Sequence, residues 1–334
     1  PISRTTFSNK VGNGAALKSL SISAGLATIN TDTVKTTGNQ SYTGAVTLSA
    51  NATLTTTSNG DVSFTSTVNG AQSLTISTNG TGDTTFSGAV GGTAALTGLS
   101  VTTDVLSAGA VTLATSSAMV VTTGGTSSIT GAITGTSATF EKAGAGNLTL
   151  SGTNTYTGTT TISAGTLTLT GSLSSSSGVV MTGTSAWDLQ VSQTIASLSM
   201  ATGNSITRTA GTSALSVSGA STLGGSVTTS GTHTYTGAVT LGADTTLTGT
   251  TITTYGTVSG NYGLTITGAA VFGNGTTDTV ILGGTGKNLS VSGATTINTD
   301  TITTSGTHTY TGAVTLGADV TLTTSAASTS GKDR

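Results

Sequence analysis

Short segments in which an apolar residue alternates with Thr or Ser recur along the whole chain. Residues 20–22 read Leu-Ser-Ile, residues 148–150 read Leu-Thr-Leu and residues 264–266 read Leu-Thr-Ile. An alternation with a period of two predicts β-strands whose apolar side chains point inward and whose hydroxyl groups point outward. Gly-Thr, Asn-Gly and Ser-Gly pairs break the runs into short strands, and no segment has the 3.6-residue periodicity of a helix. The pattern predicts an all-β fold.

Several of these segments are copies of one another. Residues 228–241 and 303–316 are identical, and residues 29–48 closely match residues 297–316. Internal repetition on this scale is typical of a solenoid, in which each unit buries its apolar face only against the next unit. The block Tyr-Thr-Gly-Ala-Val-Thr-Leu begins at Tyr42, Tyr235 and Tyr310, and a looser copy begins at Tyr156.

The strands could pair as hairpins or stack as the rungs of a coil. Equivalent apolar pairs begin at Leu148 and Leu167, and again at Leu264 and Leu289, so that each separation corresponds to one coil. Cross-strand charge pairs, which are common on hairpins, cannot be formed in number because only 6% of the residues are charged. We therefore expect a right-handed parallel β-solenoid (β-helix) of roughly 14–16 coils, with irregular repeats of about 19–25 residues per coil. We expect one domain, residues 1–334, which could be a segment of a longer surface protein.

The composition excludes several classes of protein. The chain has no Cys, which excludes disulfides and thiol chemistry, and its net charge of −2 includes no basic patch suited to nucleic acid. No apolar run reaches the roughly 18 residues of a membrane-spanning helix. Because the chain starts at Pro1 without a basic and apolar leader, we expect that a leader was removed or that a segment was excised.

The only two histidines, His233 and His308, stand two residues before a repeat tyrosine, where other copies have Gln40 and Asn154. They could form a metal-binding or pH-sensitive ladder. We favour a polar turn position at which His, Gln and Asn are interchangeable, because the two histidines are several coils apart. No metal site is expected there.

The acidic residues offer little chemistry. Asp and Gly at short spacing weakly resemble a calcium-binding nonapeptide, but that motif binds only in tandem, so we expect the carboxylates to cap strand ends. A glycan lyase or hydrolase would need clustered carboxylates with a basic residue, whereas the chain has one Glu, Glu141, beside Lys142, and an isolated Arg208. The carboxylates concerned are Asp32, Asp83, Asp278 and Asp300. We expect no enzyme, no catalytic residue, no cofactor and no metal ligand.

Two surface functions remain as remote alternatives. The repeat tyrosines could form a carbohydrate-binding face, although a tyrosine that fills the interior of a rung explains them more simply. Outward Thr ladders could bind ice, but this needs one flat face at constant coil length, and the coils vary. The tyrosines concerned are Tyr42, Tyr156, Tyr235 and Tyr310.

Residues 142–171 (KAGAGNLTLSGTNTYTGTTTISAGTLTLTG) closely resemble the autotransporter-associated β-strand repeat of Gram-negative passenger domains. Flanking segments are similar to repeats of very large haemagglutinin-like surface proteins. The resemblance implies a secreted β-solenoid on the outer surface of a Gram-negative bacterium and a role in adhesion, biofilm or passenger display. The matching residues are Lys142, Gly144, Gly146, Leu148, Leu150, Gly152, Asn154, Thr155, Tyr156, Gly158, Thr160, Ile162, Gly165 and Leu167.

We therefore expect a non-enzymatic structural protein of the bacterial surface, the stalk of an adhesin or passenger. A host or a neighbouring cell could supply its ligand. The alternative is a subunit that self-associates end to end into an extracellular filament, because the first and last repeats are alike and neither shows a polar cap.

Overall fold

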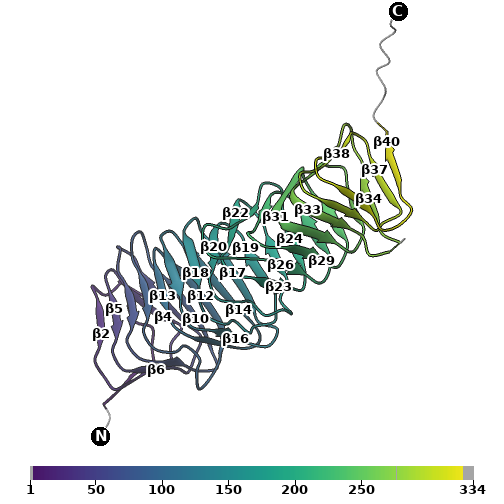
Figure 1. The fold of residues 1–334 in the computed structure, drawn as a ribbon. Helices are drawn as coiled ribbons and strands as arrows, with labels where there is room; N and C mark the ends of the chain where they lie inside the picture. Colours follow the sequence, from purple (N-terminus) through teal and green to yellow (C-terminus); the bar gives the residue numbers. More distant parts are fainter. Residues whose placement is uncertain (1–2, 276, 326–334) are drawn as a thin grey trace, which may run out of the picture. The chain divides into compact units, whose positions relative to one another are not determined.

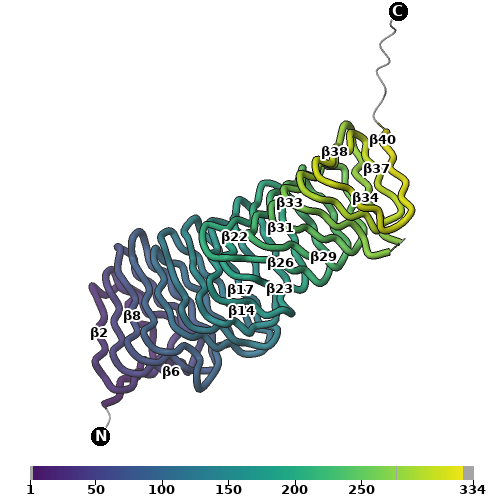
Figure 2. The backbone as a smooth tube through the Cα atoms, in the orientation of Figure 1, coloured from purple at the N-terminus to yellow at the C-terminus, as the bar shows by residue number. Residues whose placement is uncertain are grey.

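The computed structural model describes residues 3–275 and 277–325, and every regular element among them is a β-strand. The chain divides into two compact units, residues 1–178 with 184–187 (unit 1) and residues 179–183 with 188–334 (unit 2). Within each unit the chain winds in successive coils whose strands stack in parallel register (Figures 1 and 2). The all-β parallel solenoid is confirmed. Its right-handed winding and its single domain stay predictions.

Each coil of unit 1 has three faces, which we name A, B and C. Face A contains β1 (Arg4–Phe7), β3 (Leu26–Ile29), β6 (Ala45–Leu48), β9 (Val68–Asn69), the start of β14 (Val111–Thr123) and β16 (Ile133–Thr134). Face B contains β4 (Thr33–Thr36), β7 (Ala52–Thr56), β10 (Ser73–Ser77), β12 (Leu96–Thr103), the end of β14, β17 (Thr139–Ala143) and β19 (Thr160–Ile162). Face C contains β2 (Leu20–Ile22), β5 (Gln40–Tyr42), β8 (Val62–Phe64), β11 (Thr84–Phe86), β13 (Leu106–Ala108), β15 (Ser127–Ile129), β18 (Asn147–Leu150) and β20 (Gly165–Leu169).

Unit 2 also has three faces, D, E and F. Face D contains β21 (Val179–Met181), β24 (Leu198–Met200), β27 (Ser221–Leu223), β30 (Val239–Leu241), β32 (Val258–Gly260), β34 (Thr279–Leu282), β37 (Thr301–Thr304) and β40 (Thr321–Thr324). Face E contains β25 (Ser205–Thr207), β28 (Val227–Thr228), the starts of β31 (Thr245–Thr254) and β33 (Leu264–Phe272), β35 (Leu289–Val291) and β38 (His308–Tyr310). Face F contains β23 (Gln193–Ile195), β26 (Leu215–Val217), β29 (His233–Tyr235), the ends of β31 and β33, β36 (Thr295–Ile297) and β39 (Val314–Leu316). β22 (Ser185–Leu189) has residues in both units.

The alternation seen in the sequence sets which side chains enter the core. In β10, Leu74 and Ile76 are buried while Ser73, Thr75 and Ser77 lie toward the surface. The backbone groups bond the coils before and after, so side chains are left free to sort by polarity.

Like residues stack on like residues inside unit 1. Tyr42, Phe64 and Phe86 are register partners on face C, and their ring centroids are 4.9 and 5.0 Å apart in nearly parallel stacks. This separation is close to the spacing between neighbouring strands. Each aromatic side chain therefore fills one rung and supports the next.

Coil length varies although strand register is kept. Leu223 is the register partner of Leu241, whereas Leu264 is the register partner of Leu289. The first coil has slightly fewer residues than the expected range, and the number of residues in the second coil lies at the upper end of that range. The extra residues lie in the turns. Each coil contributes one strand to face B in unit 1 or to face D in unit 2. Face B has seven strands and face D has eight among the described residues, which agrees with the expected number of coils.

Identical sequences lie on different faces. In residues 228–241 the His-Thr-Tyr strand β29 lies on face F and is followed by β30 on face D. In residues 303–316, which have the same sequence, the corresponding strand β38 lies on face E and is followed by β39 on face F. The repeated unit is thus a strand, a corner and a second strand, and it is not a whole coil.

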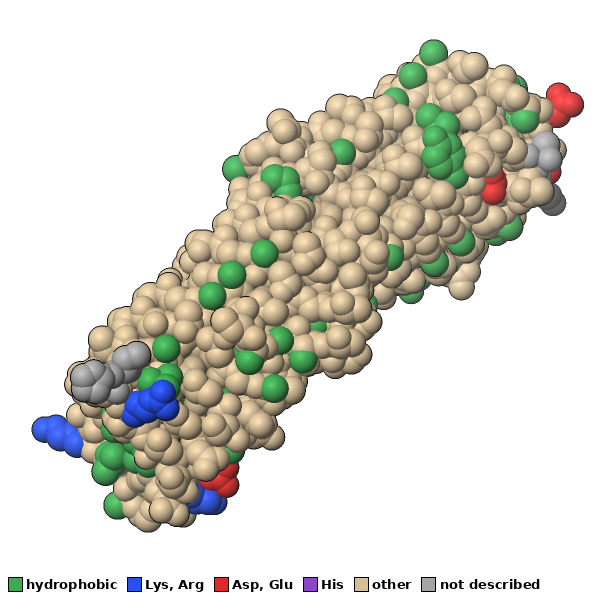
Figure 3. Space-filling view, turned by 90° about the horizontal axis from the view of Figure 1, so that it is seen from below, with side chains coloured by type: hydrophobic (Ala, Val, Ile, Leu, Met, Phe, Trp, Pro, Cys, Tyr) green, Lys and Arg blue, Asp and Glu red, His purple; other side chains and the backbone are tan. Residues whose placement is uncertain are grey.

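The surface carries few charges. Charged side chains are sparse on the face drawn in Figure 3, where most of the surface is neither hydrophobic nor charged. The described residues form two salt bridges, Lys10 with Asp32 in unit 1 and Lys287 with Asp244 in unit 2. None of the described residues belongs to a helix long and apolar enough to cross a membrane.

Candidate functional site

The histidines lie on strands and not at turns, so the expected turn position was wrong. His233 is fully buried in β29, and its Nε2 lies 2.9 Å from the Thr229 hydroxyl, while burial lowers its pKa to about 4. His308 is partly buried in β38, on face E, and burial lowers its pKa too. The two histidines occupy different faces of unit 2, so the structure does not bring them together.

The same sequence position has different partners in unit 1. Gln40 is buried in β5, donates hydrogen bonds to the carbonyls of Val34 and Thr55, and accepts one from the Tyr42 hydroxyl at 3.1 Å. Asn154 is also buried and donates to the carbonyl of Ser172 at 2.9 Å. This position is an interior polar site that ties neighbouring strands together.

The repeat tyrosines do not form a sugar-binding face. Tyr42, Tyr156 and Tyr235 are fully buried, as expected for residues that fill the interior of a rung. The Tyr156 hydroxyl lies 2.7 Å from that of Thr160, and burial raises the pKa of all three phenols above its ordinary value. Tyr310, in the last coil described, is only partly buried.

The acidic residues lie at separate turns. Asp32 accepts a hydrogen bond from Thr33 and pairs with Lys10 at 3.2 Å. Asp83 accepts the N–H of Val105 from the next coil at 3.1 Å, so the cap joins two coils. Among residues 3–275 and 277–325, no three His, Asp or Glu side chains lie close enough to hold a metal ion.

Of the other two carboxylates, Asp278 caps a turn as expected, whereas no cap is formed by the buried oxygen of Asp300. Asp278 accepts the N–H of Asn274 at 3.1 Å, within its own turn. One carboxylate oxygen of Asp300 is buried and has no hydrogen-bond partner among the described residues. Among the described residues, neither Asp278 nor Asp300 forms a hydrogen bond or an ion pair with a basic side chain.

Glu141, Lys142 and Arg208 do not assemble into a catalytic group. Lys142 is fully buried, whereas the Glu141 carboxylate lies on the other side of the strand and accepts a hydrogen bond from Ser163. Arg208 belongs to unit 2 and donates to the carbonyl of Gly211 at 2.8 Å. Each of these side chains forms hydrogen bonds with nearby backbone or with a neighbouring coil.

A groove that the sequence did not reveal lies on face E of unit 2. It has a volume of about 260 Å³ and is lined by residues at the starts of β31, β33 and β35. Asp244, Gly263 and Asn288 each precede one of these strands, and the strands pair in register. Because Gly263 has no side chain, the middle coil leaves the floor of the groove open between Asp244 and Asn288.

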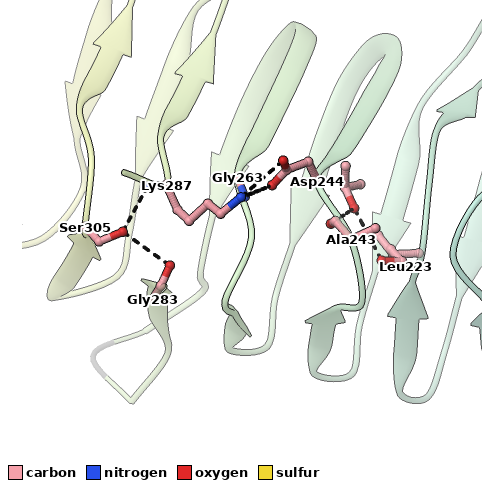
Figure 4. Close-up of polar contacts among 8 residues, drawn as sticks. Leu223, Ala243, Asp244, Gly263, Gly283, Lys287 and Ser305 are labelled. Carbon is pink, nitrogen blue, oxygen red and sulfur yellow. Dashed lines mark hydrogen bonds and ion pairs between the residues drawn. The ribbon is translucent and has the colours of Figure 1, made fainter. Parts of the chain in front are cut away.

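One ion pair crosses this groove. The Lys287 ammonium lies 2.9 and 3.2 Å from the two carboxylate oxygens of Asp244, past the intervening coil with Gly263 (Figure 4). The Gly263 N–H donates to Asp244 at 2.8 Å, and this bond, followed by the Lys287 ammonium, lowers the pKa of Asp244. The carboxylate is therefore charged at neutral pH.

Further polar groups and an aromatic ring surround the pair. Thr246 and Thr265 line the groove with hydroxyls, and the Asn288 amide nitrogen has no hydrogen-bond partner among the described residues. The exposed Tyr262 ring has its centroid 5.6 Å from the Lys287 ammonium. The groove itself combines hydrogen-bond donors and acceptors, and the Tyr262 ring stands next to it with the Lys287 ammonium over the ring.

Comparison with known proteins places one segment in a family. Residues 140–178 match the passenger-associated-transport-repeat family, which confirms the resemblance carried by residues 142–171. The matched segment begins in β17 and runs through β18, β19 and β20. Neither the curated proteins nor the solved structures gave a match. A passenger transport repeat within a parallel β-solenoid fits a passenger repeat protein of an autotransporter.

Proposed function

We propose that this chain is a stalk of a surface passenger, which holds an adhesive portion away from a Gram-negative cell. The observation that carries the proposal is the passenger repeat at residues 140–178, folded as coils of a parallel β-solenoid. In such a coil, each strand is bonded to the strands before and after it, so length is added without a new core. The charged side chains of Asp83, Lys142 and Arg208 hold turns and strands in place, and a structural role accounts for them.

The location can be tested on intact cells of the bacterium that encodes the chain. Antibodies raised against the purified 334-residue protein should label unpermeabilised cells, and external protease should remove the label. A cytoplasmic protein serves as the control and should be labelled only after permeabilisation. If this chain behaves like that control, the surface role is wrong.

A self-associating filament is the second candidate, and it would require an end rung with exposed apolar side chains. Val314, Leu316 and Leu322 are 43%, 57% and 46% exposed. In the same heptapeptide of unit 1, Val46 and Leu48 are 1% and 3% exposed because β9 pairs with β6. A further rung would bury this surface, and a rung from a second copy would make a head-to-tail contact that propagates as a filament.

Negative-stain imaging separates the two candidates. If a second copy supplies the rung, the purified chain should form filaments at high concentration, and Leu316→Lys should abolish them. The matched control is Thr315→Lys, because Thr315 lies on the same strand and its side chain alternates with the rung positions. A chain that stays monomeric at high concentration rejects the filament and leaves the stalk.

A further inference from the structure

The groove on face E concentrates chemistry that is scarce elsewhere in the chain. Only 6% of the residues are charged, yet Asp244 and Lys287 meet across this groove. The Lys287 side chain is 25% exposed and that of Asp244 is 68% exposed, so solvent reaches both partners. Concave sites with a few convergent polar groups are the usual form of small-molecule sites.

The groups present favour a neutral ligand with many hydroxyls. A sugar hydroxyl both donates and accepts a hydrogen bond, as a serine hydroxyl does. Asp244 supplies acceptors, Lys287 and the Asn288 amide supply donors, and the hydroxyls of Thr246 and Thr265 supply both. Because Asp244 already neutralises Lys287, a ligand with a strong negative charge would have to compete with that carboxylate for the ammonium.

An exposed aromatic ring stands next to the groove, beside Lys287. Tyr262 is 37% exposed and does not line the groove, but the Lys287 ammonium, which does, lies over one face of its ring. An exposed aromatic side chain presents an apolar surface together with a polar tip. The C–H groups on one face of a sugar ring could pack on such a surface while its hydroxyls reach the polar lining.

We propose that this groove binds a neutral saccharide, either one sugar ring or one residue of a longer glycan. Asp244, Lys287 and Asn288 bond its hydroxyls, and Tyr262 packs against its C–H face. Gly263 keeps the floor open, because a Cβ there would project toward the Asn288 carbonyl oxygen at 3.3 Å and the Asp244 carboxylate at 3.6 Å. The proposal goes beyond the stalk function, since it gives the stalk itself a binding site.

The test uses the full chain and saturation-transfer NMR. The probes are glucose, galactose, mannose, N-acetylglucosamine, lactose and maltose at millimolar concentration, with sialic acid and inorganic sulfate as anionic probes. We expect at least one neutral sugar to bind. Asp244→Asn, which removes a charged acceptor, and Tyr262→Ala, which removes the apolar contact, should each weaken that binding by about tenfold or more, which is about 1.4 kcal/mol.

Two matched variants separate the groove from general surface effects. Asp32→Asn breaks the Lys10–Asp32 salt bridge, in unit 1, and Tyr255→Ala removes a tyrosine that is 38% exposed. Both should leave the dissociation constant within about twofold, and circular dichroism checks that every variant folds.

Three results would overturn the proposal. One is that no neutral sugar of the panel binds, a second is that the groove variants bind as well as the controls, and a third is that the anionic probes bind in preference to the sugars. Labelling of intact cells does not depend on any of them, so a failure here leaves the proposed surface role standing.

Discussion

At the scale of single residues, the most unusual group is the Lys142 ammonium inside the coil. It is fully buried and has no carboxylate partner among the described residues. Its hydrogen bonds go to the carbonyls of Ala143 and Gly144 at 2.8 Å and of Ala164, on the next coil, at 3.3 Å. The lysine of the passenger repeat therefore joins two successive coils through their backbone.

This lysine should make stability depend on pH. Burial lowers the pKa of Lys142 from 10.5 to about 8, so the unfolded chain binds more protons between these values. The free energy of unfolding therefore rises with pH across that window, by on the order of 1–2 kcal/mol from about pH 7 to about pH 9.5. Urea denaturation should show this rise in the unmodified chain and a flatter profile in Lys142→Met. A fall in stability over the window would contradict the prediction.

The glycine after Tyr-Thr should be needed for close stacking. A Cβ at Gly237 would lie 2.5 Å from the backbone of Gly219 in the preceding coil. We expect Gly237→Val to lower the free energy of unfolding by roughly 1–3 kcal/mol, because the rungs would have to separate. Gly109→Val is the control, since nothing lies within 4 Å of a Cβ there. Equal melting temperatures for the two variants would show that Gly237 is merely tolerated.

At the scale of strands and turns, one corner module serves at two places in the coil. The Tyr-Thr-Gly turn follows face C at Tyr42, but at Tyr156 it follows a segment paired with β16 on face A. Faces A, C, E and F all accept the tyrosine segment of the module, because each needs only an inward apolar or aromatic residue and an outward hydroxyl. The residue two positions before the tyrosine then adapts to what surrounds it.

Exchange at that position should be harmless. The buried Tyr235 hydroxyl has no hydrogen-bond partner among the described residues. In His233→Gln, the new side-chain amide should accept a hydrogen bond from this hydroxyl, as the Gln40 amide does from Tyr42. The double variant His233→Gln, His308→Gln should keep its fold and its assembly state.

The buried His233 should also make stability depend on acid. Because the pKa of His233 is about 4 when folded and 6.5 when unfolded, the free energy of unfolding of the unmodified chain should decrease as pH falls from 6.5 to 4.

Acid titration of both proteins by fluorescence or circular dichroism provides the check. The double variant should lack the part of the acid loss that His233 causes. If the variant aggregates or loses its melting transition at neutral pH, the histidines have a role that these contacts do not explain.

The strands were predictable from the sequence, but their arrangement in the coil was not. Alternation fixes which side chains of β10 or β18 point inward, whatever the face. The face on which a strand lies depends on the lengths of all the turns before it. The sequence therefore could not show that two identical segments lie on different faces. The groove was missed for the same reason, because Asp244 and Lys287 are far apart in the sequence and meet only after two coils of unequal length.

At the scale of the whole molecule, stability should come from backbone ladders and apolar stacking, with little help from charge. Exposed ion pairs contribute about 0–1 kcal/mol each, and two are present among the described residues. Raising NaCl from about 50 to about 500 mM should therefore shift the melting temperature by less than about 3 °C. Far-UV circular dichroism should be β-dominated throughout, and either a helical spectrum or a large salt effect would contradict this account.

The two identical stretches at residues 228–241 and 303–316 also bear on how such a chain changes length. Each coil of unit 2 passes through three faces. Along the chain, β38 lies eleven faces after β29, and this separation equals three and two-thirds turns of the solenoid. An unequal recombination between the two stretches would delete one copy with everything between them and leave a junction indistinguishable from the native sequence. Every later strand would then move round by one face. A protein whose faces accept the same module can be shortened or lengthened by fractions of a turn, and evolution is not restricted to whole coils.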